Sequence, residues 1–597
     1  MNGPDFSRSI VIVDFGGQYA HLIASRVRRF GYRAYIASTD IKPQALKGAA
    51  GIILSGGPQS VYEAGSPQAD PKILELGVPV LGLCYGHQWL AHALGGTVGP
   101  AAVKEYGPTA IKITESACPL FHGLPQNFTV WMSHGDEVKT LPEGFAAVGG
   151  SKDCTHAVMM DMKRKLFGIQ FHIEVTHTQH GMDILRKFVD LCAPEPWSLS
   201  GYAERVGEDL KREVGDRKVF MLVSGGVDST VAFTLLNAVL GPGRVQGLLV
   251  DTGLMRKGEV QQIMDAFAPL GIKNLQVEDA SEIFYAALKG VYEPEAKRAA
   301  IGKTFLDVQR TVSERMGLRI EDGWMLGQGT IYPDTIETGG TKHADKIKTH
   351  HNRVELIQKM MEQGLVIEPL KELYKDEVRH LGEELKLPHD LVWRHPFPGP
   401  GLGVRILCAD TPFELADAPR VTDLPHVVLP VKSVGVQGDG RTYRHALSLF
   451  PEDGVPADEH YALATSIPNG SKVFSRVLAC LSHRTPFTPV FTPTFIDRVT
   501  SDLLREADAI AMNHIRKAGL SEQIWQMPVV LLPLGASEGK RSIVLRPIES
   551  TDAMTAAAFR IPGNVLAAIT CDILAVKGID AVFLDLTNKP PATIEWE

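Results

Sequence analysis

The 597-residue chain has a formal net charge of -8, and 44% of its residues are hydrophobic and 22% charged. These fractions are typical of a globular protein with large buried cores, and the length favours three or four domains. The acidic balance, without a long basic run, excludes the basic stripe that a general nucleic-acid binder normally carries, so we expect no nucleic-acid partner.

The seven cysteines have no paired spacing and form no zinc motif. This usage is typical of a reducing compartment rather than of a disulfide scaffold. The first residues lack the charged start and apolar core of a signal peptide, and no apolar stretch reaches the ~18 residues of a membrane span. We therefore expect a cytoplasmic protein without membrane contact.

The first part of the chain alternates short apolar runs with helical patterns. Residues 10–14 are predicted as a strand, residues 20–30 as a helix, and residues 52–54 and 78–83 as further strands, each followed by glycine. Such alternation predicts a mostly parallel sheet with helices on both faces, the α/β class.

A cysteine follows the last of these strands on a predicted sharp turn. Residues 82–86 (GLCYG) precede a helical run at 87–94, which gives the pattern glycine-x-nucleophile-x-glycine with Cys84 at its centre. A helix N-terminus favours a thiolate, and its amides can stabilise an oxyanion. Residues 55–58 (SGGP), at the end of the neighbouring strand, are expected to supply a second amide.

A nucleophile needs a base, and the base needs an orienting partner. On an extended chain His172 and Glu174 point to the same side, so Cys84, His172 and Glu174 can form a catalytic triad. An isolated cysteine is more often a small buried residue. The turn combined with the His-x-Glu spacing favours the triad.

The second part of the chain begins after a proline-rich stretch at 194–198 and repeats the same alternation. Strands are predicted at residues 219–223, 245–250 and 324–327, so we expect a second α/β domain in tandem. Further junctions are expected at the proline- and glycine-rich residues 395–401 and at 486–493.

A glycine- and hydroxyl-rich loop (SGGVDST) follows the strand at 219–223 and precedes a helix expected to begin near Thr230. Amides and hydroxyls in such a loop can bind phosphate oxygens, although the lysine of a Walker A loop is absent. Asp228 is a candidate for positioning Mg²⁺ with ATP. The expected ATP-binding residues are Ser224, Gly225, Gly226, Val227, Asp228, Ser229 and Thr230. Residues 250–253 either contact adenosine or form an ordinary loop.

The part after residue 403 contains two weakly similar stretches. Residues 427–430 lead to a glycine-rich turn at 438–442, and residues 530–533 lead to a similar turn at 539–542. Aligning these two stretches with each other requires a gap. We interpret this region as two related α+β subdomains.

These motifs resemble known families. The first site resembles class I glutamine amidotransferases, which hydrolyse glutamine to glutamate and ammonia, over residues 8–192; this implies a flavodoxin-like fold. Ile173 stands where that family usually has proline. The loop matches the SGGxDS signature of ATP pyrophosphatases, which implies an adenine-nucleotide α-hydrolase-like fold and cleavage of ATP between its α and β phosphates.

Further segments resemble GMP synthases: residues 327–334, 348–352, 395–403 and the C-terminal 589–597. The resemblance implies a carbon–nitrogen ligase of purine biosynthesis that uses XMP, ATP and glutamine. It also implies XMP contacts by Arg298, Asp439, Gln526, Lys589, Ile594 and Glu595. The expected domains are an amidotransferase (8–196), an ATP pyrophosphatase (203–398), an inserted subdomain (404–490) and a C-terminal dimerisation-type subdomain (491–597).

Residues 404–597 are too long for the single dimerisation domain of short bacterial members, and this length resembles eukaryotic-type members. Because a duplicated surface can satisfy a two-fold contact within one chain, we expect a monomer with an internal pseudo-dimer, with a homodimer as the alternative. Other interpretations are a tRNA-modifying enzyme, NAD synthase, CTP synthase, or a non-catalytic nucleotide sensor.

Overall fold

The computed structural model describes residues 6–17, 19–115, 117–318, 322–339, 360, 362–413, 418–437, 440–550 and 556–597. The chain forms two compact units, Met1–Gly201 and Tyr202–Glu597. The division follows the proline-rich stretch at 194–198 closely. Each unit is described by itself below.

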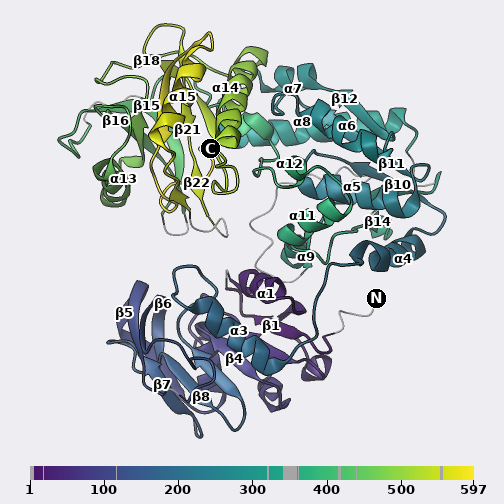
Figure 1. The fold of residues 1–597 in the computed structure, drawn as a ribbon, viewed down its shortest axis with the longest axis vertical. Helices are drawn as coiled ribbons and strands as arrows, with labels where there is room; N and C mark the ends of the chain where they lie inside the picture. The colour runs from purple at the N-terminus through teal and green to yellow at the C-terminus, as the bar shows by residue number, and fades with distance from the viewer. Residues whose placement is uncertain are drawn as a thin grey trace. The chain divides into compact units, whose positions relative to one another are not determined.

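The first unit contains a nine-stranded sheet with a parallel half (Figure 1). The sequence predicted three of its five parallel strands, β1, β3 and β4, but not β2 or β9. The strands β2 and β3 flank β1, and β4 and β9 continue the parallel part. Most of their side chains are apolar and buried, because helices cover the sheet. The bounds are β1 (Ile10–Asp14), α1 (Ala20–Arg29), β2 (Ala34–Ser38), β3 (Gly51–Leu54), β4 (Val80–Leu83), α2 (Tyr85–Ala93), β9 (Leu166–Ile169) and α3 (Gly181–Cys192).

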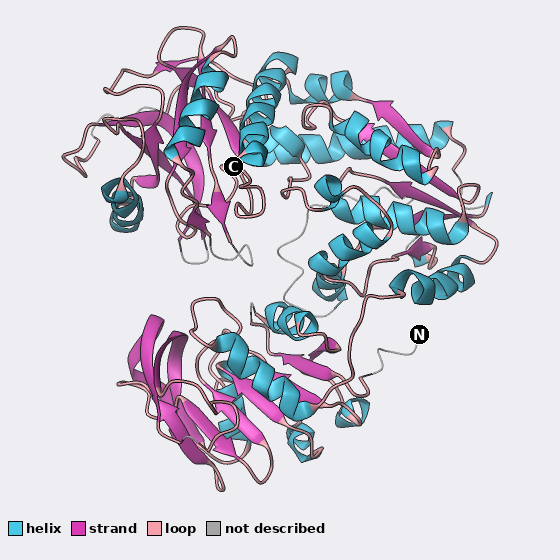
Figure 2. Ribbon diagram, viewed as in Figure 1, coloured by secondary structure: helices cyan, strands magenta, loops and turns pink. Residues whose placement is uncertain are grey.

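The other half of this sheet is antiparallel and was not predicted. It consists of β5 (Thr97–Ile113), β6 (Asn127–Thr140), β7 (Ala146–Gly150) and β8 (Val158–Asp161). In Figure 2 these magenta strands form a group at one end of the unit. Most side chains of β5 are exposed or half-buried, so the sequence lacks the apolar run that marks a buried strand.

The second unit begins with a parallel five-stranded sheet in the order β12-β11-β10-β13-β14. Helix α5 begins at Val227 rather than near Thr230, because Gly226 has extended backbone and caps the helix. The bounds are α4 (Tyr202–Val214), β10 (Lys218–Leu222), α5 (Val227–Leu240), β11 (Val245–Asp251), α6 (Glu259–Phe267), β12 (Leu275–Asp279), α7 (Ser281–Leu288), α8 (Pro294–Arg315), β13 (Trp324–Gly327), α9 (Tyr332–Gly339), β14 (Val366–Ile367), α11 (Lys375–Glu384) and α12 (His389–Val392).

The C-terminal part of this unit forms one six-stranded sheet in the order β15-β16-β17-β24-β21-β19. Strands from both expected subdomains therefore share a single sheet. The bounds are β15 (His426–Gln437), β16 (Gly440–Leu449), α13 (Asp458–Gly470), β17 (Phe474–Cys480), β18 (Val490–Phe491), α14 (Arg498–Lys517), β19 (Val529–Leu532), β20 (Leu534–Gly535), β21 (Arg541–Leu545), β22 (Ile548–Glu549), β23 (Ala557–Ala558), α15 (Gly563–Leu574) and β24 (Ile579–Asp585).

The six strands form two units of the same β-β-α-β topology. In β15-β16-α13-β17, the first two strands are antiparallel and the third is parallel to the second. The same relations hold in β19-β21-α15-β24. The two units meet where β17 pairs antiparallel with β24, which places a topological two-fold axis at the middle of the sheet. The repeat seen in the sequence thus has a structural counterpart.

Candidate functional site

Cys84 lies on a sharp turn between β4 and α2, where it is the first residue before the helix and has a φ of 51°. The two flanking glycines are required by space. A Cβ at Gly82 would lie 2.5 Å from the carbonyl oxygen of Gly86, and a Cβ at Gly86 would lie 2.3 Å from that of Leu54. A strained backbone at a single non-glycine residue is typical of a nucleophile held on a turn.

His172 and Glu174 lie together beside this cysteine. The Nδ1 atom of His172 is 2.7 Å from Oε1 of Glu174, and both side chains are buried. Burial disfavours the imidazolium, but the Glu174 carboxylate and the Cys84 side chain together raise the pKa of His172 well above its ordinary value. A histidine held in this way by a carboxylate can receive a proton from a thiol and keep it.

The sequence did not single out other residues that surround the sulfur atom. Nε2 of Gln170 lies 3.8 Å from Sγ of Cys84, and the Cys84 thiol lies 3.6 Å from the carbonyl oxygen of Ser133. A Cβ at Gly56 would lie 3.2 Å from Cε1 of His172 and 3.8 Å from Cβ of Cys84. The expected glycine-rich segment 55–58 therefore forms one wall of this site. Gln170 and Ser133 carry no sequence signal of their own, because amide and serine residues are common everywhere.

Several other buried thiols have environments that suppress their reactivity. Burial raises the pKa of Cys118, Cys154 and Cys408 to about 11, 12 and 11. A thiol with such a pKa stays protonated at neutral pH, and only the thiolate is a good nucleophile. Cys84 differs from Cys118 and Cys408 in having a buried histidine–carboxylate pair at its sulfur.

The glycine-rich loop follows β10 and enters α5. Gly225 has a φ of 77°, a conformation that glycine adopts without strain. The hydroxyls of Ser229 and Thr230 donate to the carbonyl oxygen of Gly226 at 3.1 and 2.8 Å. These bonds fix the loop around the helix N-terminus, where backbone amides and the helix dipole favour an anion.

The loop lacks a lysine of its own, but α11 brings one to it. Nζ of Lys375 forms an ion pair with Oδ2 of Asp228. The other oxygen of Asp228, Oδ1, is buried without a hydrogen-bond partner among the described residues. A free carboxylate oxygen beside a phosphate-type loop is a suitable ligand for a hard cation such as Mg²⁺.

One further segment lies against this loop, and the end of β11 lies beside β10 in the sheet. A Cβ at Gly329 would lie 3.0 Å from the backbone nitrogen of Ser229, so the segment after β13 packs directly on the first turn of α5. At the end of β11, Asp251 accepts a hydrogen bond from the amide of Gly253 at 2.9 Å. The carboxyl ends of β10, β11 and β13 thus converge, as ligand sites do in parallel sheets.

The expected XMP residues are distributed around the C-terminal tail. Glu595 accepts hydrogen bonds from Gln526 at 2.9 Å and from Arg405 at 2.9 and 3.1 Å. Arg298 donates to the backbone oxygen of Glu597. Gln526, Glu595 and Arg298 are therefore all engaged with residues of one region of the second unit. Asp439 lies outside the described residues.

Two of the expected XMP residues, Lys589 and Ile594, form backbone hydrogen bonds within the protein. The amide of Lys589 donates to Ala556 at 2.7 Å. The carbonyl oxygen of Ile594 accepts from Nε of Arg546 at 3.0 Å. Backbone groups carry no signature in a sequence, so these arrangements were not predictable.

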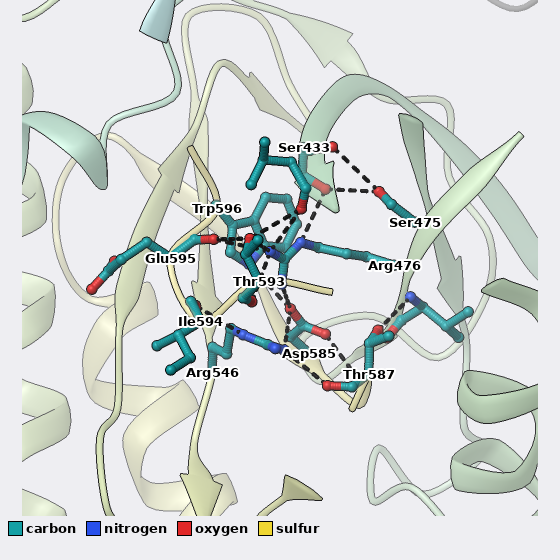
Figure 3. A network of polar contacts seen from close by, with 12 residues as sticks. Ser433, Ser475, Arg476, Arg546, Asp585, Thr587, Thr593, Ile594, Glu595 and Trp596 are labelled. Carbon is teal, nitrogen blue, oxygen red and sulfur yellow. Dashed lines mark hydrogen bonds and ion pairs between the residues drawn. The ribbon is translucent and has the colours of Figure 1, made fainter. Parts of the chain in front are cut away.

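The tail is held by a fully buried network of charged groups that the sequence analysis missed (Figure 3). Oδ2 of Asp585 lies 2.8 Å from guanidinium nitrogens of both Arg476 and Arg546. Nε1 of Trp596 donates to the same carboxylate at 3.1 Å. Arg476 also donates to the carbonyl oxygen of Thr593 at 3.0 Å. Arginine and aspartate are so often exposed that burial of these three side chains has no local signal.

A cysteine–histidine–glutamate site in one α/β unit and a phosphate-type loop in the next define a glutamine amidotransferase joined to an ATP-using ligase. Three family descriptions match the chain: glutamine amidotransferase class-I at residues 11–192, NAD synthase at 203–304, and GMP synthase C terminal domain at 513–596.

Several curated relatives match over nearly their whole length. A protein of Leptospira interrogans, named a probable glutamine-hydrolyzing GMP synthase, is 46% identical over 99% of both chains. Glutamine-hydrolyzing GMP synthases of Bifidobacterium longum and Thermobifida fusca are 40% and 38% identical, covering 100% and 99% of this chain and 97% and 98% of their own. The chain belongs to the family of glutamine-hydrolysing GMP synthases.

Among the residues that the structure describes, no helix is both long and apolar enough to cross a membrane.

Proposed function

We propose that this chain makes GMP from XMP, ATP and glutamine, releasing AMP, pyrophosphate and glutamate. The observation that carries the proposal is the presence, in one chain, of a cysteine–histidine–glutamate site, an SGGxDS loop and a segment that matches the GMP synthase C terminal domain. The first supplies ammonia, the second activates an oxygen with ATP, and the third identifies the acceptor class.

In the first stage, Cys84 attacks the glutamine side-chain amide after its proton passes to His172. Glu174 holds the imidazole through Nδ1, so Nε2 remains directed to the reacting atoms. His172 then protonates the leaving ammonia, and a water molecule resolves the thioester to give glutamate. Backbone amides of the turn at Cys84 and of the Gly56 segment stabilise the oxyanion.

In the second stage, the C2 oxygen of XMP attacks the α phosphate of ATP, giving adenyl-XMP and pyrophosphate. The loop at 224–230 and the N-terminus of α5 hold the departing pyrophosphate. Lys375 lies at the same point and supplies the positive charge that a Walker A lysine supplies elsewhere. Ammonia then displaces AMP from the purine carbon.

Mg²⁺ with ATP fits the residues of this loop. Asp228 has one oxygen paired with Lys375 and one buried oxygen free of partners among the described residues. We propose that this free oxygen would hold the cation, which would supply positive charge against the phosphates. The protein's own part is to hold Asp228 rigidly in the first turn of α5.

The tail residues are proposed to bind XMP. Arg298 and Lys589 neutralise its phosphate, and Glu595 and Asp439 accept hydrogen bonds from ribose or base. Arg405 and Gln526 already fix the carboxylate of Glu595, so this acceptor is pre-positioned before any nucleotide binds. Ammonia that mixes with bulk water becomes ammonium, which is not nucleophilic. Glutamine hydrolysis is therefore proposed to respond to nucleotide binding.

The C-terminal region is proposed to make the enzyme monomeric. The two β-β-α-β units pair through β17 and β24 within one chain, a contact that two copies would otherwise make. Light scattering of the full chain is expected to give a mass near the 65.1 kDa of one chain. A stable homodimer that depends on residues 404–597 would contradict this. A cytoplasmic location remains part of the proposal.

Product analysis tests the main proposal. The purified chain, given XMP, ATP, Mg²⁺ and glutamine, is expected to form GMP, AMP, pyrophosphate and glutamate together. Failure to consume ATP when XMP and ammonium are abundant would exclude it. Activity with nicotinate adenine dinucleotide, UTP or tRNA as the acceptor would instead favour the NAD synthase, CTP synthase or tRNA-modifying alternatives.

A further inference from the structure

A second cluster of chemically reactive side chains lies in the first unit, apart from the triad. Glu105 on β5, His134 on β6 and Cys154 in the β7–β8 connection each place one donor atom within 4.8 Å of the other two. All three residues are buried, with exposed fractions of 7%, 4% and 1%. Oxygen, nitrogen and sulfur donors converge here, and the glutamine reaction uses none of them.

The hydrogen bonds of His134 define the state of its ring. Nδ1 lies 2.9 Å from the carbonyl oxygen of Asp136, which can only accept, so Nδ1 carries a proton. Nε2 then faces Oε2 of Glu105 at 3.1 Å. With a neutral imidazole and an ionised carboxylate, a lone pair of Nε2 would face a lone pair of Oε2 at this distance, and the two would repel each other. A cation, either a proton or a metal ion, must lie between them.

The geometry points to a metal ion, and we propose that Glu105, His134 and Cys154 form a buried Zn²⁺ site. A proton would bridge only Nε2 of His134 and Oε2 of Glu105. It would not explain why the Cys154 sulfur lies close to both. Zn²⁺ takes nitrogen, sulfur and carboxylate ligands in tetrahedral sites. Bonds of about 2.0 Å place neighbouring ligands about 3.3 Å apart, close to the observed nitrogen–oxygen distance.

Two further features match the surroundings of a zinc site. The histidine donates its second ring N–H to a backbone carbonyl, and the free oxygen of Glu105 accepts from the Ser151 hydroxyl at 2.8 Å. Metal ligands are usually oriented by such bonds. Zinc bonds would bring the Cys154 sulfur and the His134 nitrogen to roughly 3.6 Å from one another.

The cluster is connected to the wall of the triad. The carbonyl oxygen of Asp136 also accepts from Nε2 of Gln88 at 2.8 Å. Gln88 donates to Gln170 at 3.2 Å, and Gln170 approaches the sulfur of Cys84 at 3.8 Å. A metal ion at His134 would therefore stabilise the polar wall behind the nucleophile, and its role is structural.

Metal content and cobalt spectroscopy of the full chain test this site. A Cys84→Ala background, without a histidine tag, removes the other thiol that faces a histidine and a carboxylate. After growth with zinc and gel filtration, we expect about one Zn²⁺ per chain by mass spectrometry. Replacement with Co²⁺ is expected to give a thiolate-to-cobalt charge-transfer band. Adding Cys154→Ser should abolish that band and lower bound zinc at least fivefold, whereas the control Cys118→Ser should keep both.

The outcomes separate the metal from a shared proton. Zinc below about 0.1 per chain together with no cobalt band would overturn the proposal and leave a protonated His134–Glu105 pair. Zinc retained after Cys154→Ser would also overturn it, because the metal would then lie elsewhere. If Cys154→Ser does not fold, the presence or absence of the cobalt band in the Cys84→Ala chain tests the proposal. His134→Gln is then the second variant that removes a ligand. These readouts do not depend on the proposed reaction.

Discussion

Lys375 and Asp228 form an ion pair at the first turn of α5, although 147 residues separate them in the chain. The SGGxDS loop has no lysine, and helix α11 supplies one from its first residue. The pair also leaves one Asp228 oxygen free. The positive charge and the cation ligand expected of a nucleotide site thus come from two distant segments.

Replacing Lys375 with alanine is expected to lower ammonia-dependent GMP synthesis by about 10²–10³-fold, since loss of one preorganised donor at a developing charge costs about 2.7–4 kcal/mol. Glutamine hydrolysis measured without nucleotides should change little. The measurement is AMP release with XMP and ammonium, and the exposed Lys371→Ala is the matched control. Equal loss in the control, or no loss in Lys375→Ala, would remove Lys375 from the site.

Replacing Cys84 with alanine is expected to abolish glutamine-dependent synthesis and to leave ammonia-dependent synthesis within about twofold, because the two centres lie in different compact units. Parallel assays with glutamine and with ammonium measure both activities. Cys118→Ala controls for loss of a buried thiol. Glutamine-dependent synthesis by the Cys84→Ala enzyme would show that another group hydrolyses glutamine.

Replacing Glu174 with glutamine is expected to lower the pKa of His172. Burial alone lowers that pKa, and the carboxylate is the largest opposing influence, so its removal leaves burial dominant. The alkaline limb of the glutaminase pH profile should therefore move to lower pH. An unchanged profile would show that Glu174 does not set the protonation of His172.

The same pair predicts a pH-dependent stability. Because the folded pKa of His172 is raised, its contribution is fully present below the unfolded value of about 6.5 and is lost as pH rises through the folded pKa. The stability difference between the native chain and Glu174→Gln should therefore be larger at pH 6 than at high pH. Thermal melts across this range measure it.

The sequence was sufficient for six of the parallel strands and for the turn at Cys84, because buried runs and glycine spacing are local signals. The six are β1, β3, β4, β10, β11 and β13. The sequence was insufficient where contacts between residues far apart in the chain determine the structure. The strands β5 and β6 are amphipathic and partly exposed, so no apolar run marks them. Lys375 reaches Asp228 only through the packing of α11 on α5, which no spacing in the chain encodes.

The contacts of the C-terminal tail, residues 589–597, also could not be predicted from the sequence. Its proline-rich sequence indicated a specific role, and the structure explains how it is held. Three buried arginines reach it, through side-chain or backbone oxygens that cannot be identified without coordinates: Arg405, Arg476 and Arg546. The predicted binding residues were found from family motifs, whereas their supports were not.

Asp585→Asn should destabilise the second unit by about 3–5 kcal/mol, because it leaves Arg476 and Arg546 buried without their shared counter-charge. These arginines hold the pKa of Asp585 below its ordinary value despite burial, so the stability it contributes is present above about pH 3.8 and is lost as pH falls through the folded pKa. Chemical unfolding at neutral pH measures the difference. The exposed Glu549→Gln should change stability by less than about 0.5 kcal/mol. If Asp585→Asn unfolds at the same denaturant concentration as the native chain, the network in Figure 3 does not hold the tail in place.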